Sequence, residues 1–266
     1  THYSIPKASN LLQIDWLKIP VGFENREIDA IALDNIISEA KNKGKKYFIA
    51  VSNMATTMFG SVDNPDVYTS ALEKHNVTYR LHIDGAYGGF VYPFSNQKSN
   101  INFSNPKISS ITIDAHKMLQ APYGTGIFVC RKGLIENVLT KEAEYVEGMD
   151  LTLCGSRSGA NAVAVWMILF TYGAYGWFEK VSILQMRTQF LCNELDKLNI
   201  NYFREPFMNI VTIHAESIPE KIAEKYDLVP QQHNENNKWY KIVLMDHVEV
   251  EHLTKFIDEL KGSLNG

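Results

Sequence analysis

Two segments of the sequence place titratable side chains directly after apolar, strand-like runs. The run "YRLHI" precedes Asp84, and the run "ISSITI" precedes Asp114, His116 and Lys117. A lysine in such a place can lose its proton when it is partly desolvated, and its amine can then attack a carbonyl carbon. Taken singly, an acid or a lysine after a strand is more typical of a cap or a solvated turn. The chemistry therefore depends on the elements that position these residues.

Those elements alternate between strands and helices. The sequence predicts strands at 47–52, 79–83, 108–113 and 126–130, and helices at 28–43 and 66–75. This alternation is typical of a three-layer α/β sheet that is largely parallel. Ligands of such sheets bind beyond the carboxyl ends of the strands, which is where Asp84 and Asp114 are expected. The small residues after each acid, Gly85, Ala86 and Ala115, would let a flat ligand approach the backbone.

The pattern changes after residue 158. A long helical run follows, with a break expected near Gly173 and Gly176, and short strands and helices then alternate to the end. We predict that residues 1–158 form part of a large ligand-binding domain, that 159–198 form a connecting helical segment, and that 199–266 form a small C-terminal α/β domain.

Composition excludes several classes of function. The 266 residues carry a net charge of -4 without a dense basic tract, which argues against a nucleic-acid surface. No apolar stretch approaches bilayer length, so no membrane association is expected. The three cysteines (130, 154 and 192) lack metal-ligand spacing, which favours reduced thiols, a cytoplasmic protein and no metal site. The opening "THYSIPKASNLL" reads as the interior of a domain, so the sequence is expected to be part of a longer chain.

Two motifs together are much more specific than any single residue. The segments "HIDGAYGGF" (82–90) and "DAHKM" (114–118) resemble the pyridoxal-phosphate enzymes of the group II amino-acid decarboxylase family, which includes aromatic-amino-acid, glutamate, histidine and tyrosine decarboxylases. "ATTMFGSVD", "CGSRSG" and "KIVLMDHV" resemble further segments of that family, with Ala55 in place of the usual glycine. The resemblance covers nearly the whole chain.

The resemblance implies a fold and an assembly. The fold is that of fold-type I pyridoxal-phosphate-dependent transferases. It has a mostly parallel, seven-stranded type of sheet in a three-layer large domain, and a small C-terminal α/β domain. Members form homodimers with the active site at the subunit interface. The family's phosphate-binding segment precedes its stacking histidine, and therefore falls upstream of Thr1.

The resemblance also implies roles for individual residues. Lys117 would hold pyridoxal phosphate as a Schiff base, Asp84 would keep the pyridine nitrogen protonated, and Ala86 would lie against one face of the ring. His2 matches the histidine that stacks on the other face, and Thr57 matches a threonine beside the ring. The catalytic set is thus Lys117, His2 and Asp84.

Two further residues are expected to contact the cofactor. The resemblance places Asp114 and His116 near the phosphate, although many relatives have Asn where Asp114 stands. An acid that faces a phosphate is unfavourable unless it bonds through water or backbone amides. Two interpretations of Asp114 are therefore equally open: it contacts the cofactor, or it does not.

Three residues keep two interpretations each. His82 shares a strand face with Asp84 and could orient it, or could be a core histidine. Arg157 could bind a substrate carboxylate through a bidentate fork, or could be structural. Tyr145 lies in the segment 132–151, which matches the family's mobile loop, and could be its catalytic tyrosine or part of a plain connection.

The function implied is the decarboxylation of an L-amino acid to its amine and CO2. A carbon-carbon lyase or an aldehyde-forming oxidative deaminase of the same superfamily would use the same cofactor and break a different bond. A third alternative is a catalytically idle homologue that serves as a binding subunit. No residue of the sequence identifies which amino acid is the substrate.

Overall fold

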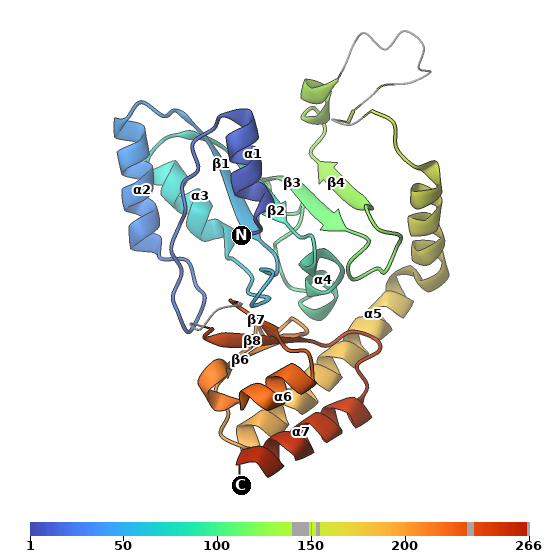
Figure 1. The fold of residues 1–266 in the computed structure, drawn as a ribbon. Coiled ribbons are helices and arrows are strands. Elements are labelled where there is room, and N and C mark those ends of the chain that lie inside the picture. Colours follow the sequence, from blue (N-terminus) through green and yellow to red (C-terminus); the bar gives the residue numbers. More distant parts are fainter. Residues whose placement is uncertain (140–148, 150, 153–154, 233–236, 265–266) are drawn as a thin grey trace.

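The computed structural model describes residues 1–139, 149, 151–152, 155–232 and 237–264 (Figure 1). The N-terminal part contains α1 (Ser4–Leu12), α2 (Ala30–Asn42), β1 (Tyr47–Asn53), α3 (Pro65–Lys74), β2 (Thr78–Asp84), α4 (Tyr92–Ser95), β3 (Ile108–Asp114) and β4 (Gly126–Cys130). The C-terminal part contains α5 (Gly159–Lys197), β5 (Tyr202–Phe203), β6 (Ile210–His214), α6 (Glu220–Lys225), β7 (Val229–Pro230), β8 (Trp239–Val243) and α7 (Val250–Leu264). Short 3-10 turns lie at Gly88–Phe90, Ile135–Val138 and Ala215–Ser217.

The larger sheet has the order β1-β2-β3-β4. The first three strands are parallel to one another, and β4 pairs antiparallel with β3. The register places Asn53 opposite Asp84, so these two residues end neighbouring strands at the same edge. All four strands begin and end within one residue of the ranges predicted from the sequence. The described residues contain only these four strands of the expected larger sheet.

Helix ends follow local capping chemistry. The Asp29 side chain accepts hydrogen bonds from the backbone N–H groups of Ile31 and Ala32 and so caps α2. Asn64 caps α3 in the same way, and Pro65 occupies the first helical position, where its missing N–H costs nothing. The caps explain why both helices begin one or two residues from the predicted start.

The two faces of the larger sheet differ in burial. Leu81 and Ile83 are fully buried on one face and belong to the core that α4 and α5 complete. Tyr47 and Ile49 point to the opposite face and are 80% and 65% exposed. Among the described residues, the helices therefore cover mainly one face of the sheet.

Helix α5 connects the two halves of the chain. Gly173 interrupts it with φ 57° and ψ -172°, which is the break expected from the sequence. After the break, Trp177 packs in the core of the larger sheet and donates a 2.7 Å hydrogen bond from Nε1 to the Phe90 carbonyl. Further along, Leu191 and Leu195 enter the core of the smaller sheet. One helix thus holds both cores together (Figure 1).

The smaller sheet is antiparallel in the order β5-β6-β8-β7 and is packed against α6 and α7. It lies close to the segment after β1. Gly60 adopts φ 65°, and a Cβ atom there would lie 2.9 Å from the Ile210 side chain, so only glycine fits this approach. No described helix is long and apolar enough to span a bilayer. The division of the chain at residues 158 and 198 stays a prediction.

Candidate active site

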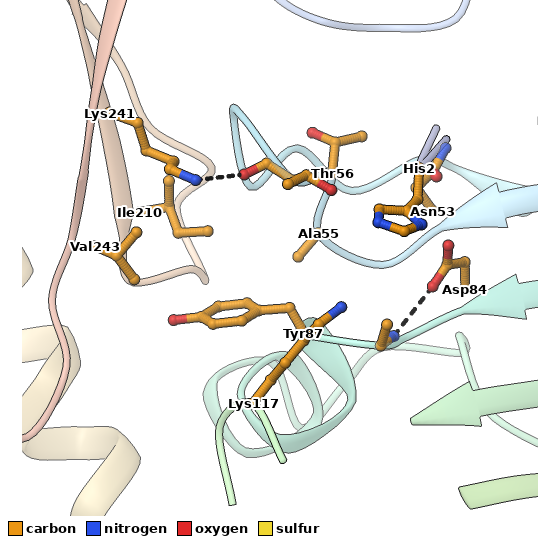
Figure 2. Close-up of a pocket in the computed structure, with 12 residues that line it drawn as sticks. His2, Asn53, Ala55, Thr56, Asp84, Tyr87, Lys117, Ile210, Lys241 and Val243 are labelled. Atoms are coloured by element: carbon orange, nitrogen blue, oxygen red, sulfur yellow. Dashed lines mark hydrogen bonds between the residues drawn. The ribbon is translucent and has the colours of Figure 1, made fainter. Parts of the chain in front are cut away.

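A pocket opens where β1 and β2 end, between the two sheets (Figure 2). It encloses about 560 Å³, including its open mouth. Segments from across the chain line it: His2, Asn53, Ala55, Thr56, Thr57, Asp84, Ala86, Tyr87, Lys117, Ile210, Lys241 and Val243. The pocket therefore gathers five of the residues singled out from the sequence: His2, Thr57, Asp84, Ala86 and Lys117.

Asp84 is the last residue of β2 and is partly buried. Its Oδ1 accepts a 3.2 Å hydrogen bond from the backbone N–H of Ala86, which fixes the carboxylate over the following turn. Among the described residues, no lysine, arginine or histidine forms an ion pair with it. A carboxylate held in this way can receive a cationic or N–H group from a ligand.

Lys117 lies in the turn that follows β3. Its Nζ is 2.9 Å from Asp114 Oδ2, and its backbone N–H donates to the Asp114 carbonyl at 3.2 Å. Asp114 therefore pairs with the lysine and does not itself line the pocket that the described residues form. The lysine amine and Asp84 nevertheless face the same space (Figure 2).

His2 precedes α1 and is oriented by the start of that helix. Its Nδ1 accepts a 3.2 Å hydrogen bond from the backbone N–H of Ser4 and lies 2.9 Å from the Ser4 hydroxyl. Because a backbone N–H can only donate, Nδ1 is an acceptor, and a neutral ring must carry its proton on Nε2. The ring can thus offer an N–H donor at Nε2.

The segment from Met54 to Asp63, here called the pocket loop, forms one wall. It is closed by a hydrogen bond of 2.9 Å from Thr56 N to the Ser61 carbonyl and by a 2.7 Å contact between the two hydroxyls. Ala55 adopts φ 77°, in the region that favours glycine. This explains why the related motif usually has glycine at that position.

Asn53 is a pocket residue that sequence reasoning missed. Buried Asp63 accepts hydrogen bonds at Oδ2 from the Asn53 backbone N–H (2.8 Å) and side-chain amide (2.7 Å), and Tyr68 donates to the same oxygen at 3.3 Å. Burial raises the pKa of Asp63 above its usual range. The carboxyl group thereby fixes the Asn53 amide at the edge of the pocket.

Lys241 was also missed, because it lies in the middle of an ordinary strand pattern in β8. Its Nζ enters the pocket and donates a 3.1 Å hydrogen bond to the Thr57 carbonyl. No carboxylate among the described residues pairs with it, and burial lowers its pKa. It is a partly buried cation that can bind an anion.

Tyr87 forms the side of the pocket toward the smaller sheet. Its hydroxyl accepts a 2.9 Å hydrogen bond from the Asn209 amide, which also donates to the Leu244 carbonyl at 2.8 Å. Asn209 is fully buried, and burial raises the pKa of Tyr87. This chain of bonds connects the turn after β2 with the smaller sheet.

Of the two interpretations of His82, the structure does not support the one in which it orients Asp84. Its Nδ1 lies 2.8 Å from the Ser110 hydroxyl and its Nε2 lies 3.2 Å from the Thr112 hydroxyl, so both nitrogens are occupied by β3. The register of β2 and β3 brings these hydroxyls alongside the ring. Burial lowers the pKa of His82, which favours the neutral ring. His82 is a partly buried histidine whose hydrogen bonds join β2 to β3, on the face of the sheet opposite Leu81 and Ile83.

Two other predicted residues, His116 and Arg157, stand apart from the pocket that the described residues form. His116 has Nδ1 3.2 Å from the Thr125 carbonyl and Nε2 3.9 Å from Asp114, and neither contact reaches the pocket. Arg157 is exposed. Tyr145 lies outside the described residues. No group of histidine, cysteine and acidic residues in the described chain could hold a metal ion.

The donor set suits a ligand that carries both an aldehyde and a basic ring nitrogen. Lys117 supplies a primary amine, and Asp84 supplies a carboxylate without a cationic partner in the same pocket. Ala86 presents only a methyl group to the pocket, where a larger side chain would take up space. These residues fit pyridoxal phosphate.

Comparisons with known proteins agree with this fit. Residues 1–207 match the pyridoxal-dependent decarboxylase conserved domain. The chain is 57% identical over 261 residues to a tryptophan decarboxylase of Clostridium sporogenes, which covers 98% of this chain and 63% of that protein. The chain therefore spans less than two thirds of the length of this relative.

Solved structures share the fold. A sphingosine-1-phosphate lyase of Burkholderia pseudomallei superposes with a TM-score of 0.83 at 17% identity, covering 100% of this chain and 61% of that one. A glutamate decarboxylase of Lactobacillus brevis gives 0.82 at 17% identity, covering 100% and 64%. The predicted fold class and family are thus confirmed. The chain belongs to the pyridoxal-dependent decarboxylase family.

Proposed function

We propose that the protein of which this chain is part decarboxylates an aromatic L-amino acid, with tryptophan as the substrate. The observation that carries the reaction is the meeting of Lys117 and Asp84 in one pocket. The choice of tryptophan is supported by the identity to the Clostridium sporogenes enzyme. The products would be the corresponding amine and CO2.

The residues that would hold pyridoxal phosphate are those that the resemblance assigned. The Lys117 amine would bind it covalently, and the Asp84 carboxylate would keep a proton on the ring nitrogen. His2 and Ala86 would lie on opposite faces of the ring, and Thr57 would lie beside it. When bound, the cofactor supplies a ring that accepts the electron pair left by the departing CO2. His116 and Asp114 stay candidates for contacts with the phosphate.

Lys241 gives the pocket a second function, the binding of the substrate carboxylate. Its ammonium lacks an acidic partner among the described residues and is partly desolvated, so an anion that reaches it gains a strong charge-assisted hydrogen bond. Lys117 already has Asp114 as its partner, at 2.9 Å. The pocket can therefore orient an amino acid by its carboxylate before the chemistry begins.

The proposal extends to a cytoplasmic homodimer with the site at the subunit interface. It is supported by the exposed apolar side chains on the uncovered parts of the molecule: Leu11, Leu12, Tyr47, Ile49, Trp166, Phe170 and Tyr175. Large apolar side chains that are exposed in this number are typical of surfaces that a partner covers. Cys130 and Cys192 are free thiols, which supports a reducing compartment.

The test compares the full-length protein with three variants after reconstitution with pyridoxal phosphate. The wild type should absorb visible light as a lysine-bound cofactor and should release CO2 and tryptamine from tryptophan. Lys117→Ala should lose both the band and the product. Asp84→Asn should keep the band and lose at least about a hundredfold in kcat, because the ring nitrogen loses its proton. Lys221→Ala removes an exposed lysine of α6 and should change neither.

Each alternative function has its own outcome in this experiment. Absence of a visible band in the wild type would identify a catalytically idle homologue. Release of ammonia and peroxide without amine would identify an aldehyde-forming deaminase. Equal release of amine from other amino acids would reject tryptophan as the preferred substrate.

A further inference from the structure

The segment between α1 and α2 reaches the smaller sheet through a turn at residues 21–28. Val21 and Ile28 form an antiparallel bridge that closes the turn. Within it, Arg26 adopts φ 58°, and its backbone N–H donates a 3.2 Å hydrogen bond to the Gly22 carbonyl. The Arg26 side chain packs against aromatic rings of this turn and of two distant segments.

Three aromatic rings surround the Arg26 guanidinium. Its Cζ lies 3.6 Å from the centre of the Phe59 ring and 5.0 Å from the centres of the Phe23 and Trp239 rings. Phe59 belongs to the pocket loop, and Trp239 is the fully buried first residue of β8. The guanidinium therefore contacts both of the segments that meet at the pocket.

The guanidinium makes this contact without hydrogen bonds at two of its nitrogens. Nε and Nη2 of Arg26 are buried and have no hydrogen-bond partner among the described residues. A buried cation is unfavourable unless something replaces its hydration, and the planar, weakly hydrated guanidinium achieves this by stacking on aromatic faces. Lysine lacks this planar group and would stack less well at this position.

The pocket loop and β8 touch at two points, one between aromatic rings and one in the pocket. On each segment the two contacting residues are two positions apart. Phe59 and Trp239 pack edge to face with ring centres 5.4 Å apart. Two residues away on each segment, the Thr57 carbonyl accepts the 3.1 Å hydrogen bond from Lys241 Nζ. Residues two apart on a strand share a face, so Trp239 and Lys241 leave the same face of β8 about 7 Å apart.

We propose that Arg26 is a positioning residue, which keeps the Lys241 ammonium in the pocket by stacking between the pocket loop and the start of β8. Loss of the stack would let β8 move relative to the pocket loop, and Lys241 would then leave the Thr57 carbonyl. The positioning itself does not depend on the reaction. Its effect on substrate binding rests on the proposed function.

The test measures the accessibility of the Lys241 amine in the holoenzyme. Wild type and variants are treated briefly with N-acetoxysuccinimide, and acetylation of Lys241 relative to exposed Lys221 is quantified by peptide mass spectrometry. Arg26→Ala should raise this ratio about threefold or more, which corresponds to the loss of one cation–π contact. Arg26→Lys should give a smaller rise. Arg80→Ala removes an exposed arginine outside the stack and should leave the ratio unchanged.

Two outcomes would overturn the proposal. One is an unchanged ratio in Arg26→Ala. The other is an equal rise at Lys221 and Lys241, which would mean general loosening. If Arg26→Ala does not fold, Phe59→Leu removes the stacked ring, keeps an apolar side chain and should raise the ratio in the same way.

Kinetics separate this inference from the proposed function. If the protein decarboxylates tryptophan, Arg26→Ala should raise KM with kcat within about twofold, because binding is lost and the reacting groups are unchanged. A wild type without activity would reject the proposed function, whereas the labelling ratio would still decide the role of Arg26.

Discussion

Lys241 Nζ donates a 3.1 Å hydrogen bond to the carbonyl oxygen of Thr57, although the two residues are 184 positions apart. The lysine comes from the smaller sheet and the threonine from the loop after the first strand of the larger one. The pocket at the end of the larger sheet thus contains a cation, the Lys241 ammonium, that comes from the smaller sheet. The cation is partly buried, and its pKa is lowered for that reason.

The first prediction concerns carboxylate binding by Lys241. We expect Lys241→Met to raise KM for tryptophan about tenfold to a hundredfold, because a charged hydrogen bond is worth about 1.5–3 kcal/mol. Lys241→Arg keeps the charge and should recover most of the affinity. Steady-state kinetics of the reconstituted protein measure both effects, and a change confined to kcat would contradict this role.

The same residue predicts a pH dependence of binding. Burial lowers the pKa of Lys241 below the ordinary value of 10.5. The ammonium is therefore lost at a lower pH than in an exposed lysine, as the pH rises through the lowered pKa. Indole-3-propionate, which has a carboxylate and no amine to titrate, should bind progressively more weakly on the alkaline side. In Lys241→Arg this loss should disappear, because arginine stays charged.

A third prediction concerns the backbone of the pocket loop. Ala55 adopts φ 77°, where an L side chain costs roughly 1–2 kcal/mol. Ala55→Gly should therefore raise the free energy of unfolding by about 1 kcal/mol, measured by urea denaturation. Gly44 is the matched control, since it has φ 86° with open space around it. Gly44→Ala should destabilise the protein by a similar amount, and a destabilised Ala55→Gly would refute the strain.

A fourth prediction concerns acid stability and His82. Burial lowers the folded-state pKa of His82 below 6.5, so the folded protein binds this proton less readily than the unfolded chain. Its contribution is fully present above pH 6.5 and is lost as the pH falls toward the lowered folded-state pKa. Each tenfold difference in proton affinity between the folded and unfolded states contributes about 1.4 kcal/mol to the free energy of unfolding.

The measurement is the change in Tm between pH 7.5 and pH 5. His82→Gln should lower Tm at pH 7.5 through altered packing, and should show a smaller further decrease on acidification than the wild type. The exposed residue His247 provides the control, and His247→Gln should behave as the wild type does. If Tm fell equally on acidification in all three proteins, His82 would not be the group that causes the loss of stability in acid.

Local patterns in the sequence predicted the elements well. The run before Asp84 alternates apolar and polar residues over a full strand, and the run before Asp114 does so at Ile111 and Ile113. Both strands end within one residue of the predicted positions. Gly173 broke the long helix as expected, because no other residue type adopts φ 57° and ψ -172° so readily. Strand ends and helix breaks of this kind depend on residues that are close in the sequence, so the sequence predicts them.

Features that depend on docking between distant segments could not be predicted. The hydroxyls of Ser110 and Thr112 occupy His82 because of the register of two strands, which no local pattern encodes. Lys241 lies in a short strand whose pattern shows nothing unusual, and its entry into the pocket depends on how the sheets meet. The roles of His2, Thr57 and Ala86 stay predictions, although all three line the pocket.

The pocket draws its lining from residue 2 to residue 243. Contacts between such distant parts of a chain form late in folding, because each one requires a long loop to close first. A refolding chain would therefore recover its helices and its individual sheets before it could capture the cofactor. Return of the visible band would then mark the final step of maturation, and an early arrest would leave a compact protein that stays colourless.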